Sequence, residues 1–136
     1  MYRKSRMGEV FARATFYGPN GRTISLRLLV DTGSTYTCIP REIAKSLGVR
    51  AAGRVHLELA NGRSASRSIG DVEIEILGRR APRRIVFGRS GDTSQIGVDT
   101  LQGLLLDVEP RRHRLRPRAR ALAISPRATR LIPKQA

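Results

Sequence analysis

The sequence feature that most constrains the fold of this chain is an apolar strand that runs directly into an acidic residue. Residues 28–34 read Leu-Leu-Val-Asp-Thr-Gly-Ser, and apolar character resumes at Tyr36–Ile39. A carboxylate where two buried strands meet costs free energy unless it is hydrogen-bonded or functional. Gly33 lets the backbone turn sharply, so that its amide can approach the carboxylate of Asp31. This stretch therefore predicts a buried β framework with a functional acidic residue at its centre.

The composition fits one soluble domain. The chain has 136 residues, of which 40% are hydrophobic, which is enough for a modest core but not for two lobes. Its single cysteine, Cys38, excludes an internal disulfide and lies in an apolar segment, so we expect a buried thiol and a reducing compartment. No apolar run approaches the length of a membrane span, and no apolar signal segment follows the basic start. We therefore expect a cytoplasmic protein with no membrane partner.

Positive charge is concentrated at the C-terminal end. The formal net charge is +15, and every charged side chain after Glu109 is basic. We divide the chain into a basic N-terminal segment (1–7), a folded domain (8–117) and a basic C-terminal tail (118–136). Such a tail could bind nucleic acid or another polyanion weakly through counterion release, but its sequence has no aromatic residue for base stacking. A solvated, frayed tail is the simpler interpretation.

Alternating apolar and polar residues predict mostly β structure in the first part of the chain. Strands are expected at 8–17, 23–30 and 35–39. A Gly-Pro-Asn-Gly turn joins the first two as a hairpin, so the second strand delivers Asp31 at its end. Pro40 is expected to occupy the first position of a short helix, which ends at Leu47 and is closed by Gly48.

A second hairpin is predicted around Asn61-Gly62, a strong turn signal. The strand before it alternates Val55, Leu57 and Leu59 with polar residues, and we expect His56 to be exposed. The return strand, 63–69, has almost no apolar residue. We therefore expect the hairpin tip to project into solvent and to be mobile.

The remaining elements are shorter. Further strands are expected at 72–76, 85–87 and 95–97, with a turn at 78–80 and a loop at 88–94. Asp99 is expected to cap the N-terminus of a helical turn. A last hairpin pairs 105–109 with 114–116, and we expect His113, in its turn, to be exposed.

The order of these motifs resembles that of the retropepsin-like aspartic proteases, in particular the small prokaryotic single-domain members. The motifs are Leu-Val-Asp-Thr-Gly-Ser, Ile-Pro before a short helix, an Asn-Gly hairpin and Ile-Gly-Val-Asp-Thr-Leu, and the likeness covers residues 9–117. The resemblance implies a closed β barrel with one or two short helices that is active as a homodimer. It also implies that strand 28–30 and segment 95–97 pass beside each other under the active site.

The resemblance also implies the site residues of an aspartic endopeptidase. Asp31, Thr32 and Gly33 would be catalytic, with Thr32 bracing the partner loop and Gly33 contacting the substrate main chain. The substrate, a peptide or protein, would bind in an extended form at Ser34, Asn61, Gly62, Arg63, Ile96 and Gly97. No cofactor or metal is expected. The basic residue that retroviral members carry after the apolar-Gly pair is replaced here by Val98, so that ion pair cannot hold the dimer.

The chemistry gives an independent reason to expect a dimer. Hydrolysis by an activated water needs two carboxylates that share one proton. The chain offers one Asp-Thr-Gly, and Asp92-Thr93-Ser94 lacks both the glycine and the preceding apolar strand. A symmetric dimer would supply two copies of Asp31 across its axis. A hydroxyl at Ser34 could also donate a hydrogen bond to the outer oxygen of Asp31, or to a nearby backbone group instead.

A second function remains open at this stage. A basic binding protein, for example one associated with nucleic acid, could use the same scaffold with Asp31 in a structural or vestigial role. The intact Asp-Thr-Gly-Ser between apolar segments favours the peptidase, because a pure binding protein would not need it.

Overall fold

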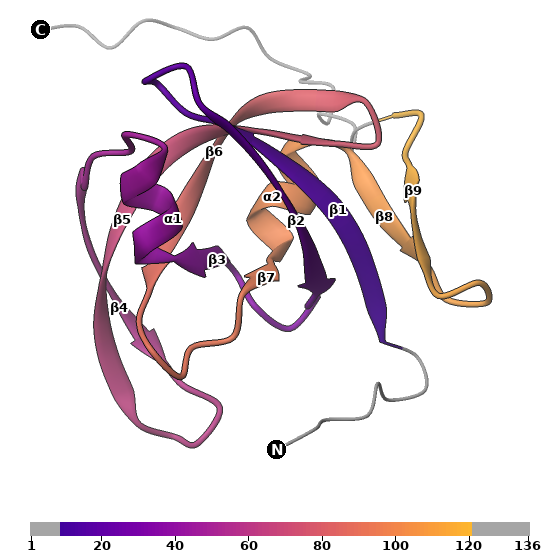
Figure 1. Ribbon diagram of the computed structural model, residues 1–136. Helices are drawn as coiled ribbons and strands as arrows, with labels where there is room; N and C mark the ends of the chain where they lie inside the picture. Colours follow the sequence, from indigo (N-terminus) through magenta and orange to yellow (C-terminus); the bar gives the residue numbers. More distant parts are fainter. Residues whose placement is uncertain (1–8, 121–136) are drawn as a thin grey trace, which may run out of the picture.

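The computed structural model describes residues 9–120, which form nine strands and two short helices (Figure 1). The strands are β1 (Val10–Tyr17), β2 (Thr23–Val30), β3 (Thr37–Pro40), β4 (Gly53–Glu58), β5 (Ser64–Ile76), β6 (Arg79–Gly88), β7 (Gln95–Ile96), β8 (Leu106–Glu109) and β9 (Arg114–Pro117). The helices are α1 (Arg41–Ser46) and α2 (Val98–Gly103). The predicted mostly-β class is confirmed.

Seven of the strands form one sheet in the order β1-β2-β7-β3-β6-β5-β4, and β1 also pairs with β5. Two neighbouring pairs are parallel, β2 with β7 and β3 with β6, and the other pairs are antiparallel. β8 and β9 form a separate two-stranded sheet. The three hairpins predicted from the sequence, β1–β2, β4–β5 and β8–β9, are confirmed.

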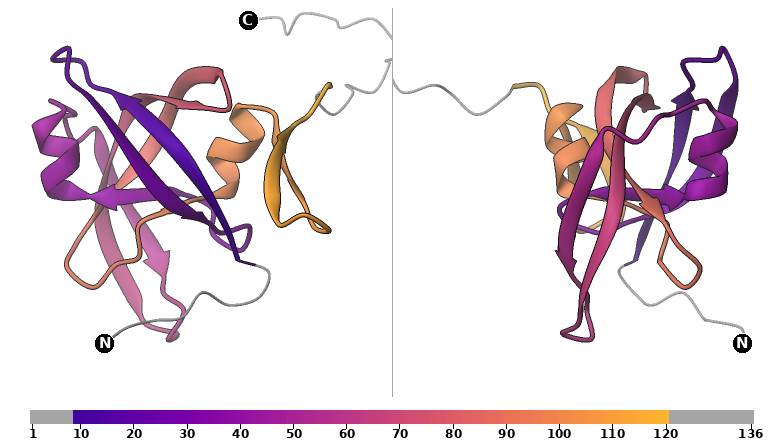
Figure 2. Two further views of the ribbon diagram at one scale, coloured as in Figure 1. Left: turned by 45° about the vertical axis from the view of Figure 1, so that its right-hand side comes forward. Right: turned by 90° about the vertical axis from the view of Figure 1, so that its left-hand side faces the viewer.

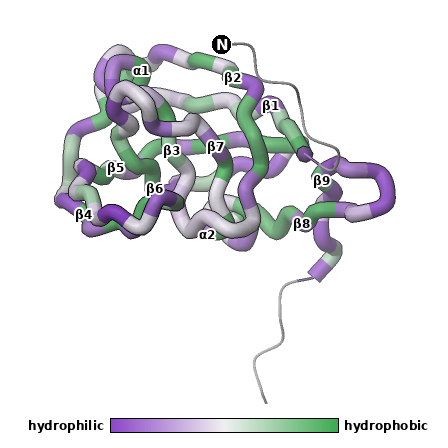
Figure 3. Tube along the Cα trace, turned by 90° about the horizontal axis from the view of Figure 1, so that it is seen from below, coloured by the Kyte–Doolittle hydropathy of each residue, from purple (hydrophilic) through white to green (hydrophobic). Residues whose placement is uncertain are grey.

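The main apolar core is enclosed by these strands. Its largest fully buried apolar side chains come from strands and from the end of α1: Phe16, Ile39, Leu47, Ile74, Ile76, Ile85 and Ile96. Burying a side chain of this size stabilises the fold by about 2 kcal/mol. In the right-hand view of Figure 2, α1 and α2 lie on opposite flanks of the strands. Figure 3 shows that the hairpin tip beyond β4 and the loop between β8 and β9 are mostly hydrophilic.

β5 is one continuous strand of 13 residues, where the sequence pattern predicted two. The polar half pairs with β4 and the apolar half with β6, and Ile69 belongs to both ladders. Because ladder hydrogen bonds join backbone groups, the change from polar to apolar side chains does not interrupt the strand. Apolar alternation alone could not reveal this continuity.

β6 begins at Arg79, six residues before the predicted strand at 85–87. The turn lies at Leu77-Gly78, where both φ angles are positive (52° and 78°), and not at 78–80. A two-residue turn of this kind matches the strand twist. Arg79 therefore already pairs with Ile76, and the guanidinium of Arg80 forms an ion pair with Glu73 at 2.7 Å. At the start of β6, charged side chains form pairs with β5 across the sheet, so this part of the strand shows no apolar alternation in the sequence.

Both helices begin differently from the prediction. Pro40 still pairs with Gly88 in the β3–β6 ladder, so it is the N-cap of α1 and not its first helical residue. Gly97 is the N-cap of α2 because its backbone is extended (φ −96°, ψ 174°). The prediction that Asp99 caps α2 is therefore wrong. Asp99 lies inside the first turn, where its carboxylate accepts a hydrogen bond from Arg83 at 3.1 Å.

The exposure of the two histidines and of the cysteine was also predicted from the sequence. His56 and His113 are exposed and Cys38 is buried, as predicted. In the described part of the chain, no helix is long and apolar enough to cross a membrane. The basic segment 1–7 and most of the tail, from residue 121 on, lie outside the described residues, so their predicted roles stay predictions.

Candidate active site

Asp31 follows β2, and both oxygens of its carboxylate accept hydrogen bonds. Oδ1 accepts from the backbone N–H of Gly33 at 2.9 Å, and Oδ2 accepts from the hydroxyl of Ser34 at 2.9 Å. A Cβ at residue 33 would lie 3.3 Å from Oδ1, so glycine gives the amide a close approach that a larger residue would crowd. Hydrogen bonds to both oxygens fix the orientation of the carboxylate.

The loop that carries Asp31 is held against β7 and the start of α2. The backbone N–H of Asp31 donates to the carbonyl of Ile96 at 2.9 Å. From the other side, the N–H groups of Val98 and Asp99 donate to the carbonyls of Ser34 and Thr35 at 2.8 and 2.9 Å. β2 also pairs directly with β7. The two segments therefore lie side by side, as the resemblance implied.

A buried pair of hydroxyl groups supports this arrangement. Thr37 and Thr100 are both fully buried, and their Oγ1 atoms are hydrogen-bonded at 2.6 Å. The hydroxyl of Thr37 also accepts the N–H of Gly97 at 3.1 Å. A Cβ on Gly97 would lie 2.4 Å from the carbonyl carbon of Tyr36, so this crossing requires glycine. Neither threonine was predicted as a buried partner, although Thr37 lies inside an apolar strand, which is a signal for a buried polar contact.

The β4–β5 hairpin extends on the side of the molecule where the Asp31 loop and the β6–β7 loop also lie (Figure 1). At its tip, the N–H of Gly62 donates to the carbonyl of Leu59 at 2.9 Å, and Gly62 has a φ of 81°. Arg63 donates its N–H to the side chain of Asn61 at 3.0 Å. The tip is thus a three-residue loop stabilised by its own contacts.

The comparison with protein families gives the decisive observation. Residues 12–100 match a family model described as aspartyl protease. The match spans more than half of the chain and contains the Asp31 loop, β7 and the start of α2. The chain belongs to the aspartyl protease family.

The resemblance to retropepsin-like aspartic proteases is thereby confirmed. A solved structure, a retropepsin-like aspartic protease from Rickettsia conorii, is similar at 18% identity over 78% of this chain and 88% of that chain, with a TM-score of 0.45. The family assignment rests on the sequence match. A search of curated proteins finds no match.

By their exposure, the predicted site residues fall into three groups. The exposed group lies on the Asp31 loop and the hairpin tip: Thr32, Gly33, Asn61, Gly62 and Arg63. Asp31 and Ser34 are half-buried, whereas Ile96 and Gly97 are buried behind the loop. Ile96 and Gly97 hold the Asp31 loop through backbone contacts, and substrate binding by either residue stays a prediction.

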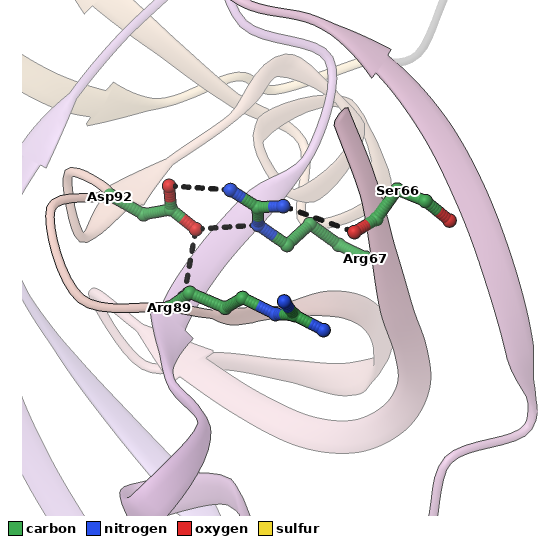
Figure 4. Close-up of polar contacts among 4 residues, drawn as sticks. All are labelled: Ser66, Arg67, Arg89 and Asp92. Carbon is green, nitrogen blue, oxygen red and sulfur yellow. Dashed lines mark hydrogen bonds and ion pairs between the residues drawn. The ribbon is translucent and has the colours of Figure 1, made fainter. Parts of the chain in front are cut away.

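An ion pair that the sequence analysis did not predict joins the hairpin to the β6–β7 loop (Figure 4). Nε and Nη2 of Arg67, on β5, donate to the two carboxylate oxygens of Asp92 at 2.8 and 3.0 Å. One of these oxygens also accepts the N–H of Arg89 at 2.8 Å. The side chains are only 14% and 18% exposed. Hydrogen bonds from Arg67 lower the pKa of Asp92, so this aspartate has a structural partner.

Cys38 lies in a small apolar cluster with Ile69 and Val86, below the base of the hairpin. Burial raises the pKa of its thiol to about 11, and the charge of Asp92 adds to this effect. A protonated, buried thiol is a poor nucleophile. The geometry therefore offers no cysteine-based chemistry at this site.

The described residues contain no group of three His, Cys, Asp or Glu side chains that could hold a metal ion. The chemistry that the site can support is acid–base chemistry at the carboxylate of Asp31.

Proposed function

We propose that the protein is a homodimeric aspartic endopeptidase, built as a closed retropepsin-like barrel, in which two Asp31 side chains activate the attacking water. The observation that carries the proposal is the Asp-Thr-Gly-Ser loop, whose carboxylate is oriented through both oxygens. One carboxylate of the pair would be charged and take a proton from water, while the other would be protonated and donate to the peptide carbonyl.

Neither aspartate that flanks β7 is a free second carboxylate. Asp92 is bonded to Arg67 and Asp99 to Arg83. The Asp31 loop itself is accessible, because Thr32 and Gly33 are exposed. These facts support a site completed by a second copy of the chain across a two-fold axis.

The substrate in this proposal is an extended peptide that lies between the Asp31 loop and the β4–β5 hairpin. Three half-buried side chains, Tyr36, Val55 and Leu57, pack against the small cluster around Cys38. Because they combine apolar surface with partial exposure, we propose that they favour apolar side chains next to the cleaved bond.

Cleavage of a peptide library by the purified full chain tests the proposal. Asp31→Asn should reduce cleavage to below about one per cent while the protein stays folded, because asparagine can neither share the proton nor activate water. Asp71→Asn, the same change at an exposed carboxylate on β5, should leave cleavage unchanged. Equal cleavage by the Asp31→Asn variant would show that the chemistry lies elsewhere.

A further inference from the structure

A cavity lies between α1 and the end of β6. It has a volume of about 220 Å³ and takes its walls from α1, the segment after it, β5 and β6. Its lining residues are Arg41, Lys45, Val49, Ala51, Ser68, Phe87 and Arg89. None of them belongs to the Asp31 loop or the hairpin tip, so this cavity is separate from the proposed active site.

All three ionisable residues that line the cavity are cationic. Arg41 and Lys45 lie four positions apart on α1 and therefore share one face of the helix, and Arg89 follows β6. Soluble surfaces usually intersperse both signs of charge. Like charges around one small space repel one another, and a bound anion would relieve that repulsion.

These cations make few direct contacts, although Glu42 acts electrostatically on Arg41 and Lys45, and Asp92 on Arg89. Within residues 9–120, the side chains of Lys45 and Arg89 make no hydrogen bond or ion pair, and Arg41 makes only an exposed contact with Glu42 at 3.3 Å. The backbone of Arg89 is nevertheless fixed, since its N–H donates to Asp92 (Figure 4). The guanidinium of Arg89 thus lines the cavity without a hydrogen-bonded partner among the described residues, while the backbone of the same residue is held in place.

The other walls provide a hydroxyl group and apolar surface. Ser68 Oγ accepts a hydrogen bond from Arg54 at 3.2 Å, which leaves its own proton available for an anion. Val49 and Phe87 line the cavity beside the charged side chains. A bare inorganic anion would leave this apolar surface unused, whereas an organic phosphate would contact it with its carbon atoms.

We propose that this cavity is a binding site for a phosphomonoester. The phosphoryl oxygens contact Arg41, Lys45 and Arg89, because guanidinium and ammonium groups are the side chains best suited to phosphate. The hydroxyl of Ser68 donates a further hydrogen bond, and the ester carbons lie against Val49 and Phe87. A ligand bound there links α1 to the loop that holds Arg67 of the hairpin.

A titration of the full chain with glycerol 3-phosphate, followed by amide NMR, tests the proposal. Signals of residues on α1 and around Ser68 and Arg89 should shift and saturate at millimolar ligand. Glycerol should cause no shift, and inorganic phosphate should bind more weakly than the ester. The double variant Lys45→Gln/Arg89→Gln should weaken binding of the ester at least tenfold.

The matched control is Arg13→Gln/Arg111→Gln, which removes two exposed positive charges elsewhere and should bind the ester as the unchanged chain does. Circular dichroism should show that both variants are folded. Shifts that never saturate, or equal weakening in both double variants, would overturn the proposal in favour of general attraction to a basic surface. Tighter binding of inorganic phosphate than of the ester would overturn the assignment of the ligand class.

Discussion

The Asp31 loop and the tip of the β4–β5 hairpin lie on the same side of the molecule but are held in opposite ways. The loop is hydrogen-bonded to β7 and α2, segments more than 60 residues further along the chain. The tip makes its hydrogen bonds within itself, between Leu59 and Arg63. In the proposed peptidase, this difference would give a rigid catalytic loop and a hairpin tip that opens for a peptide and closes over it.

The ion pair between Arg67 and Asp92 lies at the boundary between the two regions. It connects β5 to the loop that leads into β7. This contact ties the lower half of the hairpin to that loop, so we expect any opening of the hairpin to involve the part beyond Arg67. Three predictions test how differently the Asp31 loop and the hairpin are held.

Adding one methyl group should affect the two regions unequally. Gly97→Ala places a Cβ 2.4 Å from Tyr36, so it should lower the free energy of unfolding by about 3 kcal/mol. Gly62→Ala meets no atom within 4 Å and is disfavoured only by its positive φ, so it should cost about 1 kcal/mol. Urea denaturation measures both changes. Equal losses would mean that the Asp31 loop is no more constrained than the hairpin tip.

Breaking the ion pair should destabilise the base of the hairpin in a pH-dependent way. Arg67→Gln should lower the free energy of unfolding by about 2 kcal/mol at pH 7 and raise KM more than it lowers kcat, because a partly buried carboxylate loses its partner. The pKa of Asp92 is lowered in the folded state. The contribution of Asp92 to the free energy of unfolding is therefore present above its unfolded-state pKa of about 3.9. This contribution is lost as the pH falls through the folded-state pKa.

The control for this prediction is Arg84→Gln, which removes an exposed ion pair with Asp71 at 3.5 Å and should cost at most about 0.5 kcal/mol. Urea denaturation at pH 7 and at pH 2.5 provides the comparison. A loss caused by Arg67→Gln that is as large at pH 2.5 as at pH 7 would show that the side chain acts through packing and not through its charge.

Much of this architecture could be predicted from the sequence because each predicted hairpin has a local signal in its turn residues and in the strands beside them. Alternation and turn residues identified the β1–β2 hairpin, and the motif order identified the crossing of residues 28–30 with 95–97. The rest depends on contacts between distant residues. The bond between Thr37 and Thr100 spans 63 positions and that between Arg67 and Asp92 spans 25, and neither leaves a periodic pattern. The continuity of β5 was missed because its polar half is held by backbone pairing and by polar side-chain contacts, neither of which gives apolar alternation.

The smallest effect is expected at Ser34. Its hydroxyl donates to Oδ2 of Asp31 at 2.9 Å, which is one of the two partners that the sequence analysis considered. This hydrogen bond holds the carboxylate of Asp31 in one orientation. Ser34→Ala should therefore lower kcat about fivefold and leave KM unchanged, as expected for the loss of a hydrogen bond worth about 1 kcal/mol, and steady-state kinetics measure both. An unchanged kcat would show that the carboxylate keeps its orientation without the hydroxyl.

In the proposed peptidase each chain supplies half of one active site, and mixing wild-type protein with an inactive variant tests this arrangement. Wild-type protein, at a concentration where it is dimeric, is equilibrated with an equal amount of the Asp31→Asn variant, and peptide cleavage is measured. Random pairing of the two kinds of chain should reduce the rate to about half, and a large excess of the variant should abolish it, because mixed dimers hold a single functional carboxylate. A rate that stays unchanged at every ratio, although the chains exchange, would contradict the shared site.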